Sequence, residues 1–298
     1  MKRFGQLLRA AARAALCGVL ALTALQAAAD AASERALYGQ LQTRLNSPNN
    51  FNRALHIDSV ESADVLKGDV YALLDHPFAM VSSSLKEPSQ WCDILILPFN
   101  TKYCHGVQAN GSPALLVRIG RKFDQPVQNA YRIQFGYRNV AQAADYFETR
   151  LNAASGPVGT RDYRIIVSAI PVEGGKTFLH LSYSYGYGMA GKIAMQAYLG
   201  TVGADKIGFT VTGRDAGGRP LYIGGMRGAV ERNAMRYYLA IDAYLDSLAI
   251  PREQQVERRI NAWFTATERF PRQLHEMDRG TYVSMKRSEY ERQTTLIQ

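Results

Sequence analysis

The chain has 298 residues, of which 47% are hydrophobic and 20% are charged, a composition typical of a folded globular protein. Its formal net charge is +9, from 35 basic and 26 acidic residues, but four of the basic residues stand in the first 13 positions. The rest of the chain carries a mild excess of 31 basic over 26 acidic residues, which does not indicate a nucleic-acid partner.

The first 29 residues have the pattern of a cleavable signal peptide. A basic start with Lys2 and Arg3 is followed by an apolar stretch over residues 14–25 and by small residues up to Ala29. This stretch is shorter than the roughly 18 to 20 residues of a membrane-spanning helix. Cys17 precedes most of it and does not predict lipidation. We therefore expect cleavage near Ala29 and a mature chain that is periplasmic or secreted.

Cleavage would leave one pair of cysteines, Cys92 and Cys104, in an oxidising compartment. This favours a disulfide, which would stabilise the fold by about 3 kcal/mol and hold Trp91 in place. A metal site is the weaker alternative, because His105 adjoins Cys104 but no second Cys or His pair follows at zinc-ligand spacing. We predict no metal and no cofactor.

The mature chain begins with a lead-in segment, residues 30–54, in which a short amphipathic helix over 33–45 precedes a polar break at 46–52. A strand follows at 65–74. Two short helices are then expected over 78–85 and 89–95, separated by Pro88.

The middle of the chain alternates apolar and polar residues with period two, as half-buried antiparallel strands do. Turn-forming sequences at 155–159 and 173–175 separate the later strands and favour a meander of adjacent neighbours. One face of this sheet should be apolar and aromatic. The four strands that show the pattern most clearly span residues 115–120, 131–138, 163–169 and 179–187.

Helices dominate the last third of the chain. After a helix-like segment at 192–199 and a hairpin-like segment at 207–223, a long helix is expected over 231–248, ended by Pro251. Another helix should span 253–269, before Pro271. The cluster Arg227, Glu231, Arg232 and Arg236 begins the long helix at spacings that allow ion pairs.

This order of elements resembles the START-like (helix-grip, SRPBCC) superfamily. The DHPF segment at 75–78, leading into VSSSLKEPSQWCDIL, is similar to the family's first helix pair with Trp91 as its aromatic closing position. The resemblance implies an α+β fold over residues 55–250, in which an antiparallel sheet grips a long C-terminal helix. The segments at 192–199 and 207–223 depart from the family pattern, as does a C-terminal helical extension over 251–298.

START-like proteins typically enclose a lipid or other hydrophobic ligand between sheet and helix, and some are cyclases or carry other enzymatic activity. The resemblance therefore implies a cavity walled by the aromatic sheet face and the long helix. A filled core is the competing interpretation, but a dry core rarely accommodates several phenol hydroxyls without partners. The candidate ligand-binding residues are Trp91, Val117, Ile119, Ile133, Phe135, Tyr163, Ile165, Tyr183, Tyr185, Tyr187, Tyr237 and Ile241.

The glycines at 186, 188 and 191 form a GxGxxG string followed by Asp215, a spacing found in dinucleotide sites. The strand before it alternates with polar residues and no βαβαβ series follows, so we interpret the glycines as a strand-to-helix turn. His180 lies on the polar sheet face and is expected to be a surface or capping residue. That face also carries Arg118, Arg132, Arg138 and Arg164, which would either bind anionic lipid headgroups or lie in solvent.

The sequence thus predicts an extracytoplasmic α+β protein that binds or carries a hydrophobic small molecule, with a lipid as the first candidate. Peripheral membrane contact is a further expectation, and nucleic acid is not an expected partner. An enzyme of cyclase or hydrolase type on the same scaffold is one alternative. A structural or assembly protein with a filled core is another. No catalytic residue is predicted, because the chain lacks the GxSxG, HExxH and paired DxD patterns.

Overall fold

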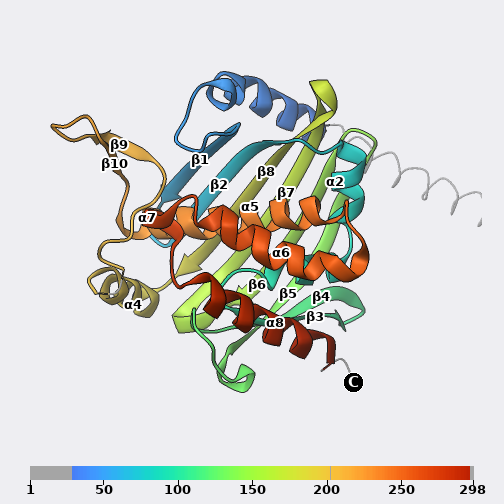
Figure 1. Ribbon diagram of the computed structural model, residues 1–298, viewed down its shortest axis with the longest axis vertical. Coiled ribbons are helices and arrows are strands. Elements are labelled where there is room, and N and C mark those ends of the chain that lie inside the picture. Colours follow the sequence, from blue (N-terminus) through green and yellow to red (C-terminus); the bar gives the residue numbers. More distant parts are fainter. Residues whose placement is uncertain (1–28, 202, 296–298) are drawn as a thin grey trace, which may run out of the picture.

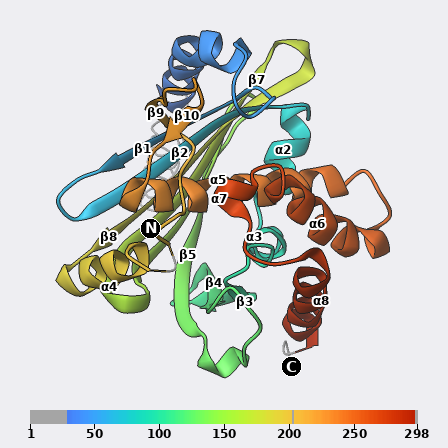
Figure 2. The same cartoon turned by 60° about the vertical axis from the view of Figure 1, so that its left-hand side comes forward.

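The computed structural model describes residues 29–201 and 203–295. An antiparallel sheet of eight strands, in the order β1-β2-β8-β7-β6-β5-β4-β3, forms the centre of the molecule, and helices cover both of its faces (Figures 1 and 2). The predicted α+β class is confirmed. The strands are β1 (Leu55–Glu61), β2 (Val65–Leu74), β3 (Thr101–Ala109), β4 (Ser112–Ile119), β5 (Tyr131–Gln142), β6 (Phe147–Ser155), β7 (Thr160–Val172) and β8 (Lys176–Tyr187).

The order of the elements agrees with the predicted arrangement, in which an antiparallel sheet grips a long helix. Two short helices, α2 (Phe78–Ser84) and α3 (Pro88–Leu95), connect β2 to β3, and the chain then runs through a meander to β8. There β8 returns to pair with β2 over the whole length of that strand. The long helix α5 (Gly225–Ser247) follows, and β1 is an additional strand at the sheet edge.

Helix α5 crosses the sheet in close contact with β2. A Cβ atom on Gly68 would lie 3.2 Å from the carbonyl oxygen of Val230 and 3.3 Å from the Cβ of Ala234. A larger residue at this position would push the helix away, so the absence of a side chain permits the approach. Next to this contact, Tyr238 and Leu239 are buried in the main hydrophobic cluster.

Between β8 and α5 the chain makes an excursion through α4 (Met189–Leu199) and a small hairpin of β9 (Val211–Arg214) and β10 (Pro220–Tyr222). Both were expected, although α4 begins earlier than the predicted residue 192. Figure 1 shows α4 at one end of the sheet and the hairpin projecting from the molecule. None of the described helices combines the length and apolarity of a membrane span.

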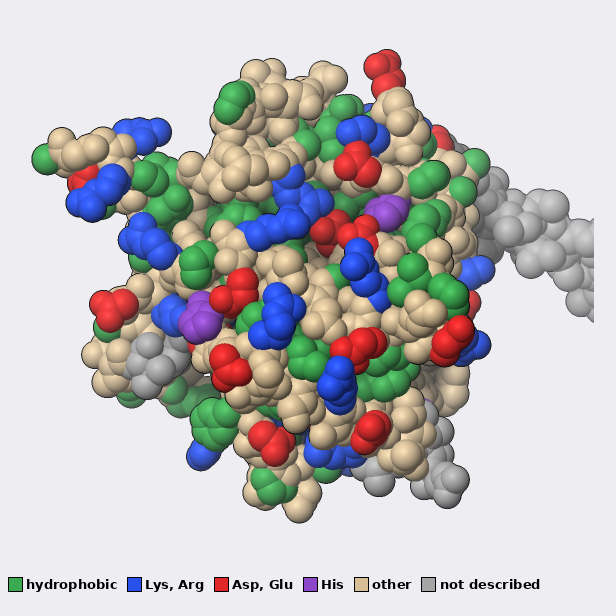
Figure 3. Space-filling view, in the orientation of Figure 1, with side chains coloured by type: hydrophobic (Ala, Val, Ile, Leu, Met, Phe, Trp, Pro, Cys, Tyr) green, Lys and Arg blue, Asp and Glu red, His purple; other side chains and the backbone are tan. Residues whose placement is uncertain are grey.

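The C-terminal helices α6 (Arg252–Thr267), α7 (Pro271–Leu274) and α8 (Arg279–Thr295) pack on the same side of the sheet as α5 (Figure 1). Their aromatic side chains belong to the main hydrophobic cluster, because Trp263 and Tyr282 stack on each other and both meet Phe99 edge to face. The extension therefore shares the core of the sheet, while its outer surface carries basic and acidic side chains side by side (Figure 3).

Helix α8 is attached through a fully buried group of charges. The carboxylate of Glu289 accepts hydrogen bonds from Lys102 on β3 at 2.9 Å and from Lys286 at 2.7 Å. Backbone carbonyls of Pro98 and Thr101 accept further bonds from Lys286. Burial lowers the pKa of Lys286 to about 8, although Glu289 opposes this effect. Charges buried so completely require partners of this kind.

The predicted disulfide between Cys92 and Cys104 is present and joins α3 to β3, with a Cα–Cα distance of 5.1 Å. Both cysteines are buried in the main hydrophobic cluster. The cross-link fixes the helix pair α2–α3 against the far edge of the sheet.

The N-terminal helix, residues 29–46, covers the part of the opposite face that β2, β7 and β8 form (Figure 2). Its Leu41 and Leu45 form a second hydrophobic cluster with Tyr71 of β2 and Phe178 of β8. The N-terminal helix therefore belongs to the packed structure. The predicted signal peptide lies almost entirely outside the described residues.

This helix also corrects the prediction that His180 is a surface or capping residue. His180 is mostly buried, its Nε2 lies 2.9 Å from Asp69 on β2, and its Nδ1 lies 3.2 Å from Glu34 on the N-terminal helix. Burial lowers the pKa of His180, but the hydrogen bonds to the two carboxylates outweigh it and raise that pKa to about 9. Lys67 also binds Asp69, and Tyr71 stacks on the imidazole ring.

The protonated His180 should therefore stabilise the fold in a pH-dependent manner. Its contribution is fully present below the unfolded pKa of 6.5 and is lost as the pH rises through about 9. Relative to a His180→Gln variant, the wild type should lose about 3 kcal/mol of unfolding free energy across this range, measured by urea titration. The control is His275→Gln at an exposed histidine. A stability difference that stays constant with pH would contradict this assignment.

Candidate functional site

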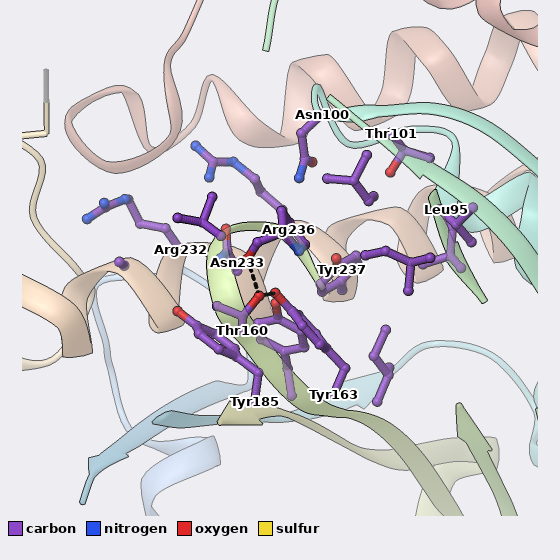
Figure 4. A pocket seen from close by; sticks show the side chains of 18 of the residues that line it. Leu95, Asn100, Thr101, Thr160, Tyr163, Tyr185, Arg232, Asn233, Arg236 and Tyr237 are labelled. Atoms are coloured by element: carbon purple, nitrogen blue, oxygen red, sulfur yellow. Dashed lines mark hydrogen bonds between the residues drawn. The ribbon is translucent and has the colours of Figure 1, made fainter. Parts of the chain in front are cut away.

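A cavity of about 340 Å³ lies between the sheet and the first half of α5 (Figure 4). We call it the grip cavity. Four strands of the sheet form one wall, α5 forms the opposite wall, and α4 and the β6–β7 turn lie at one end. Residues of the sheet wall are Val117, Ile119, Ile133, Phe135, Tyr163, Ile165, Tyr183 and Tyr185; those of α5 are Ala229, Arg232, Asn233, Arg236 and Tyr237.

Tyrosines make up much of the apolar wall. The rings of Tyr163 and Tyr185 stack at 5.3 Å, and Tyr183 packs against Tyr237 of α5 at 5.2 Å. The hydroxyl of Tyr163 lies 2.7 Å from Thr160 Oγ1, and Figure 4 shows this pair at the base of the cavity.

The other tyrosine hydroxyls have no such partner. In the part of the chain that the structure describes, those of Tyr183, Tyr185 and Tyr237 form no hydrogen bond with protein atoms. Burial raises the pKa of all three, so these groups stay protonated and can donate to a ligand.

The α5 wall is polar and basic. Arg232 and Arg236 are 2% and 5% exposed, and both line the cavity together with Asn233. The carboxylate of Glu276 accepts a 2.6 Å bond from Arg236 and another of 2.6 Å from Lys122, which also lines the cavity. Burial raises the pKa of Glu276, but these cations outweigh it and hold that pKa below its ordinary value.

Exposed apolar side chains gather near the α4 end of the cavity. Met189 and Ile193 of α4 are 74% and 59% exposed, and Val158, in the β6–β7 turn that packs against α4, is 62% exposed. Val158 also lines the cavity. We call these three residues the apolar rim. An exposed group of this kind commonly marks a contact surface.

Nine of the twelve predicted ligand-binding residues line the grip cavity, whereas Trp91, Tyr187 and Ile241 lie elsewhere. The indole of Trp91 donates to the carbonyl of Leu85 at 2.8 Å and closes the α2–α3 pair, away from the cavity. Ile241 is fully buried in the hydrophobic cluster. The hydroxyl of Tyr187 donates to the carbonyl of Ser62 in the β1–β2 turn, at the end of β8.

The sequence did not identify the basic wall, although its residues share one helical stripe. Positions 229, 232, 233, 236 and 237 follow the i, i+3, i+4, i+7 spacing of a single helix face. The charged residues were interpreted as ion pairs within the helix. Instead, Glu231 is buried and accepts bonds from Ser59 on β1 and from the backbone of Phe209 and Thr210.

The GxGxxG string is a strand-to-helix turn, as interpreted. A Cβ atom on Gly191 would lie 3.3 Å from both the Cβ of Tyr187 and the carbonyl oxygen of Val158, so the glycine permits close packing of α4. Asp215 lies in the β9–β10 turn, where it binds Arg219. Among the described residues, no three His, Cys, Asp or Glu side chains converge as metal ligands.

A second hollow, of about 530 Å³, lies beside the disulfide and is lined mainly by polar residues that include His105, Arg252 and Arg259. It lies outside the space between sheet and α5. The grip cavity is the stronger candidate, because an apolar wall with a few polar groups is typical of small-molecule sites.

Comparisons with known proteins found similar structures but no similar sequences. No family model and no curated protein matches the chain. An aromatase/cyclase from a Streptomyces species is 12% identical, with 73% of this chain and 96% of that chain covered and a TM-score of 0.31. A norcoclaurine synthase from Thalictrum flavum is 12% identical, with 50% and 91% covered and a TM-score of 0.32. The protein Ara h 8.0201 is 10% identical, with 47% and 91% covered and a TM-score of 0.32.

Proposed function

We propose that this protein binds or carries a hydrophobic small molecule in the grip cavity, with a lipid as the first candidate. The observation that carries the proposal is a cavity of about 340 Å³ walled by aromatic and aliphatic side chains. Protein interiors are close-packed and contain few voids larger than a water molecule. A space of this size lies within the range of small-molecule sites.

The tyrosine hydroxyls support the same proposal. Tyr183 and Tyr185 are 5% and 4% exposed, but their hydroxyl oxygens are not among the fully enclosed polar atoms that lack a partner. These hydroxyls therefore reach the open space of the cavity. A ligand with a polar group, or water that such a ligand displaces, would satisfy them. A filled core offers no comparable reason to place three phenols together.

We give binding precedence over catalysis. The side chains that line the described cavity offer hydroxyl, amide, guanidinium and ammonium groups, whereas general acid–base catalysis most often uses His, Asp or Glu. The names of two structural neighbours refer to enzymes, a cyclase and a synthase. An enzyme on this scaffold is therefore the second candidate, and conversion of an extracted ligand by the purified protein would establish it.

Filling the cavity should abolish binding without unfolding the protein. Ala194 lines the grip cavity from α4, whereas Ala197 on the same helix is exposed. We expect Ala194→Phe to weaken binding of the neutral fluorescent reporter N-phenylnaphthylamine at least about tenfold, because the added ring occupies the ligand's space. Ala197→Phe is the matched control and should bind like the wild type. Equal reporter binding by both variants would place the ligand elsewhere.

Contact with a membrane surface is part of the proposal, and we place the entry of a lipid at the α4 end of the cavity because the apolar rim lies there. We expect Met189→Glu with Ile193→Glu to reduce cosedimentation with phosphatidylglycerol vesicles several-fold, since charges oppose insertion of the rim. The control is Val60→Glu with Leu221→Glu, at apolar residues that are 58% and 49% exposed on other elements. Equal losses in both double variants would exclude a specific role for the rim.

We also propose that the mature chain works outside the cytoplasm, in the periplasm or after secretion. The supporting observations are the pattern of the first 29 residues and the buried disulfide, which is typical of oxidising compartments. Intact mass measurement of the protein from the producing cell should give a chain that begins at Asp30. A full-length mass would refute cleavage.

A further inference from the structure

We infer that the ligand of the grip cavity carries an anionic group, a carboxylate or a phosphate, at the end that meets the α5 wall, and that Arg232 and Arg236 hold it. This inference rests on the proposed function and specifies its substrate class as an acidic amphiphile. It starts from the unequal chemistry of the two walls, because the sheet supplies rings and aliphatic chains whereas α5 supplies guanidinium groups and an amide.

The two arginines are placed to meet a ligand inside the molecule. They stand four residues apart on α5 and therefore lie on one face, with Asn233 and Tyr237 beside them (Figure 4). Both are almost removed from bulk water. An anion that reaches them would therefore interact through a poorly screened medium, where attraction between charges is stronger than at a surface.

Several cations gather at this wall. Lys122, Arg236 and Lys206 all have a nitrogen within 4 Å of the carboxylate of Glu276, at 2.6, 2.6 and 3.8 Å. Arg232 lies one helical turn from Arg236.

Glu231, the acidic residue next to Arg232 on α5, serves a different contact. Glu231 accepts hydrogen bonds from the Ser59 hydroxyl at 2.6 Å and from the backbone nitrogens of Phe209 and Thr210 at 2.6 and 2.9 Å. It is absent from the cavity lining.

Protein contacts hold the guanidinium groups at the wall. Arg232 donates to the carbonyl of Ile207 at 3.2 Å, and Arg236 binds Glu276 and lies over the ring of Phe99. Such contacts fix the orientation of a planar group before a ligand arrives, which reduces the entropic cost of binding. The fork of N–H donors on arginine matches the paired oxygens of a carboxylate or a phosphate.

The inference can be tested with three ligands that share one alkyl chain. Laurate, dodecyl phosphate and dodecanol would each be titrated against the protein loaded with the neutral reporter N-phenylnaphthylamine at neutral pH. We expect at least one acid to bind about tenfold more tightly than the alcohol, as for a hydrogen bond to a charged group. The stronger of the two acids would distinguish a carboxylate from a phosphate headgroup.

Variants of Arg232 test whether this residue of the α5 wall causes the preference for the acids over dodecanol. In Arg232→Met the acids should lose most of their advantage while dodecanol binds as before, because the alkyl site is intact. Arg232→Lys keeps the charge but loses the fork of donors, so it should retain only part of the preference. Arg258→Met removes an equal charge at an exposed position on α6 and should have no effect. Unchanged binding of dodecanol shows that each variant is folded.

The possible outcomes separate the two claims. If all three ligands displace the reporter from the wild type equally well, the anionic headgroup is refuted and the hydrophobic site remains. The same conclusion follows if Arg232→Met retains the full preference. If neither the reporter nor any of the three ligands binds, the proposed function itself fails and the inference fails with it.

Discussion

The pairing of β2 with β8 is the constraint on which the rest of the structure depends. It joins ten residues near the start of the domain to a strand more than a hundred residues later. The pairing thereby unites β1 and β2 with the meander in one sheet. Helix α5 then packs tightly over β2, where Gly68 lets it approach. Because the helix is held at this point, its opposite stripe, which carries Arg232 and Arg236, stands over β4, β5 and β7 with a space beneath it. The grip cavity is thus a consequence of where α5 makes its closest contact.

The sequence predicted five of the eight strands, β2, β4, β5, β7 and β8, and did not predict β1, β3 and β6. Period-two alternation correctly indicated β4, β5, β7 and β8 and the side that each turns to the core. In β1 and β3 the polar residues Ser59 and Lys102 occupy buried positions. Their partners, Glu231 and Glu289, are remote in sequence, and local periodicity contains no information about such partners.

The sequence predicted the aromatic sheet wall of the cavity but not the basic wall on α5. Tyr183, Tyr185 and Tyr163 were identifiable because an alternating strand fixes the face on which each side chain lies. The basic wall was not, because a charged stripe at helical spacing is typical of a solvated helix surface, and its burial depends on Glu276 from another part of the chain. His180 shows the same limit, since the helix that covers it is contributed by residues 29–46. Whether a charged residue is buried depends on tertiary contacts, which the local sequence does not reveal.

The buried contact between β3 and α8 has a consequence for the order of folding. Lys102 lies inside the core with its ammonium group bound to Glu289, which is close to the end of the described chain. Until α8 docks, burial of β3 would leave a cation without its counterion, at a cost of several kcal/mol. The edge of the sheet should therefore complete its packing only after α8 has been synthesised and has docked. Until then the partly folded chain would keep apolar surface and a strand edge exposed, and such surfaces are prone to aggregation.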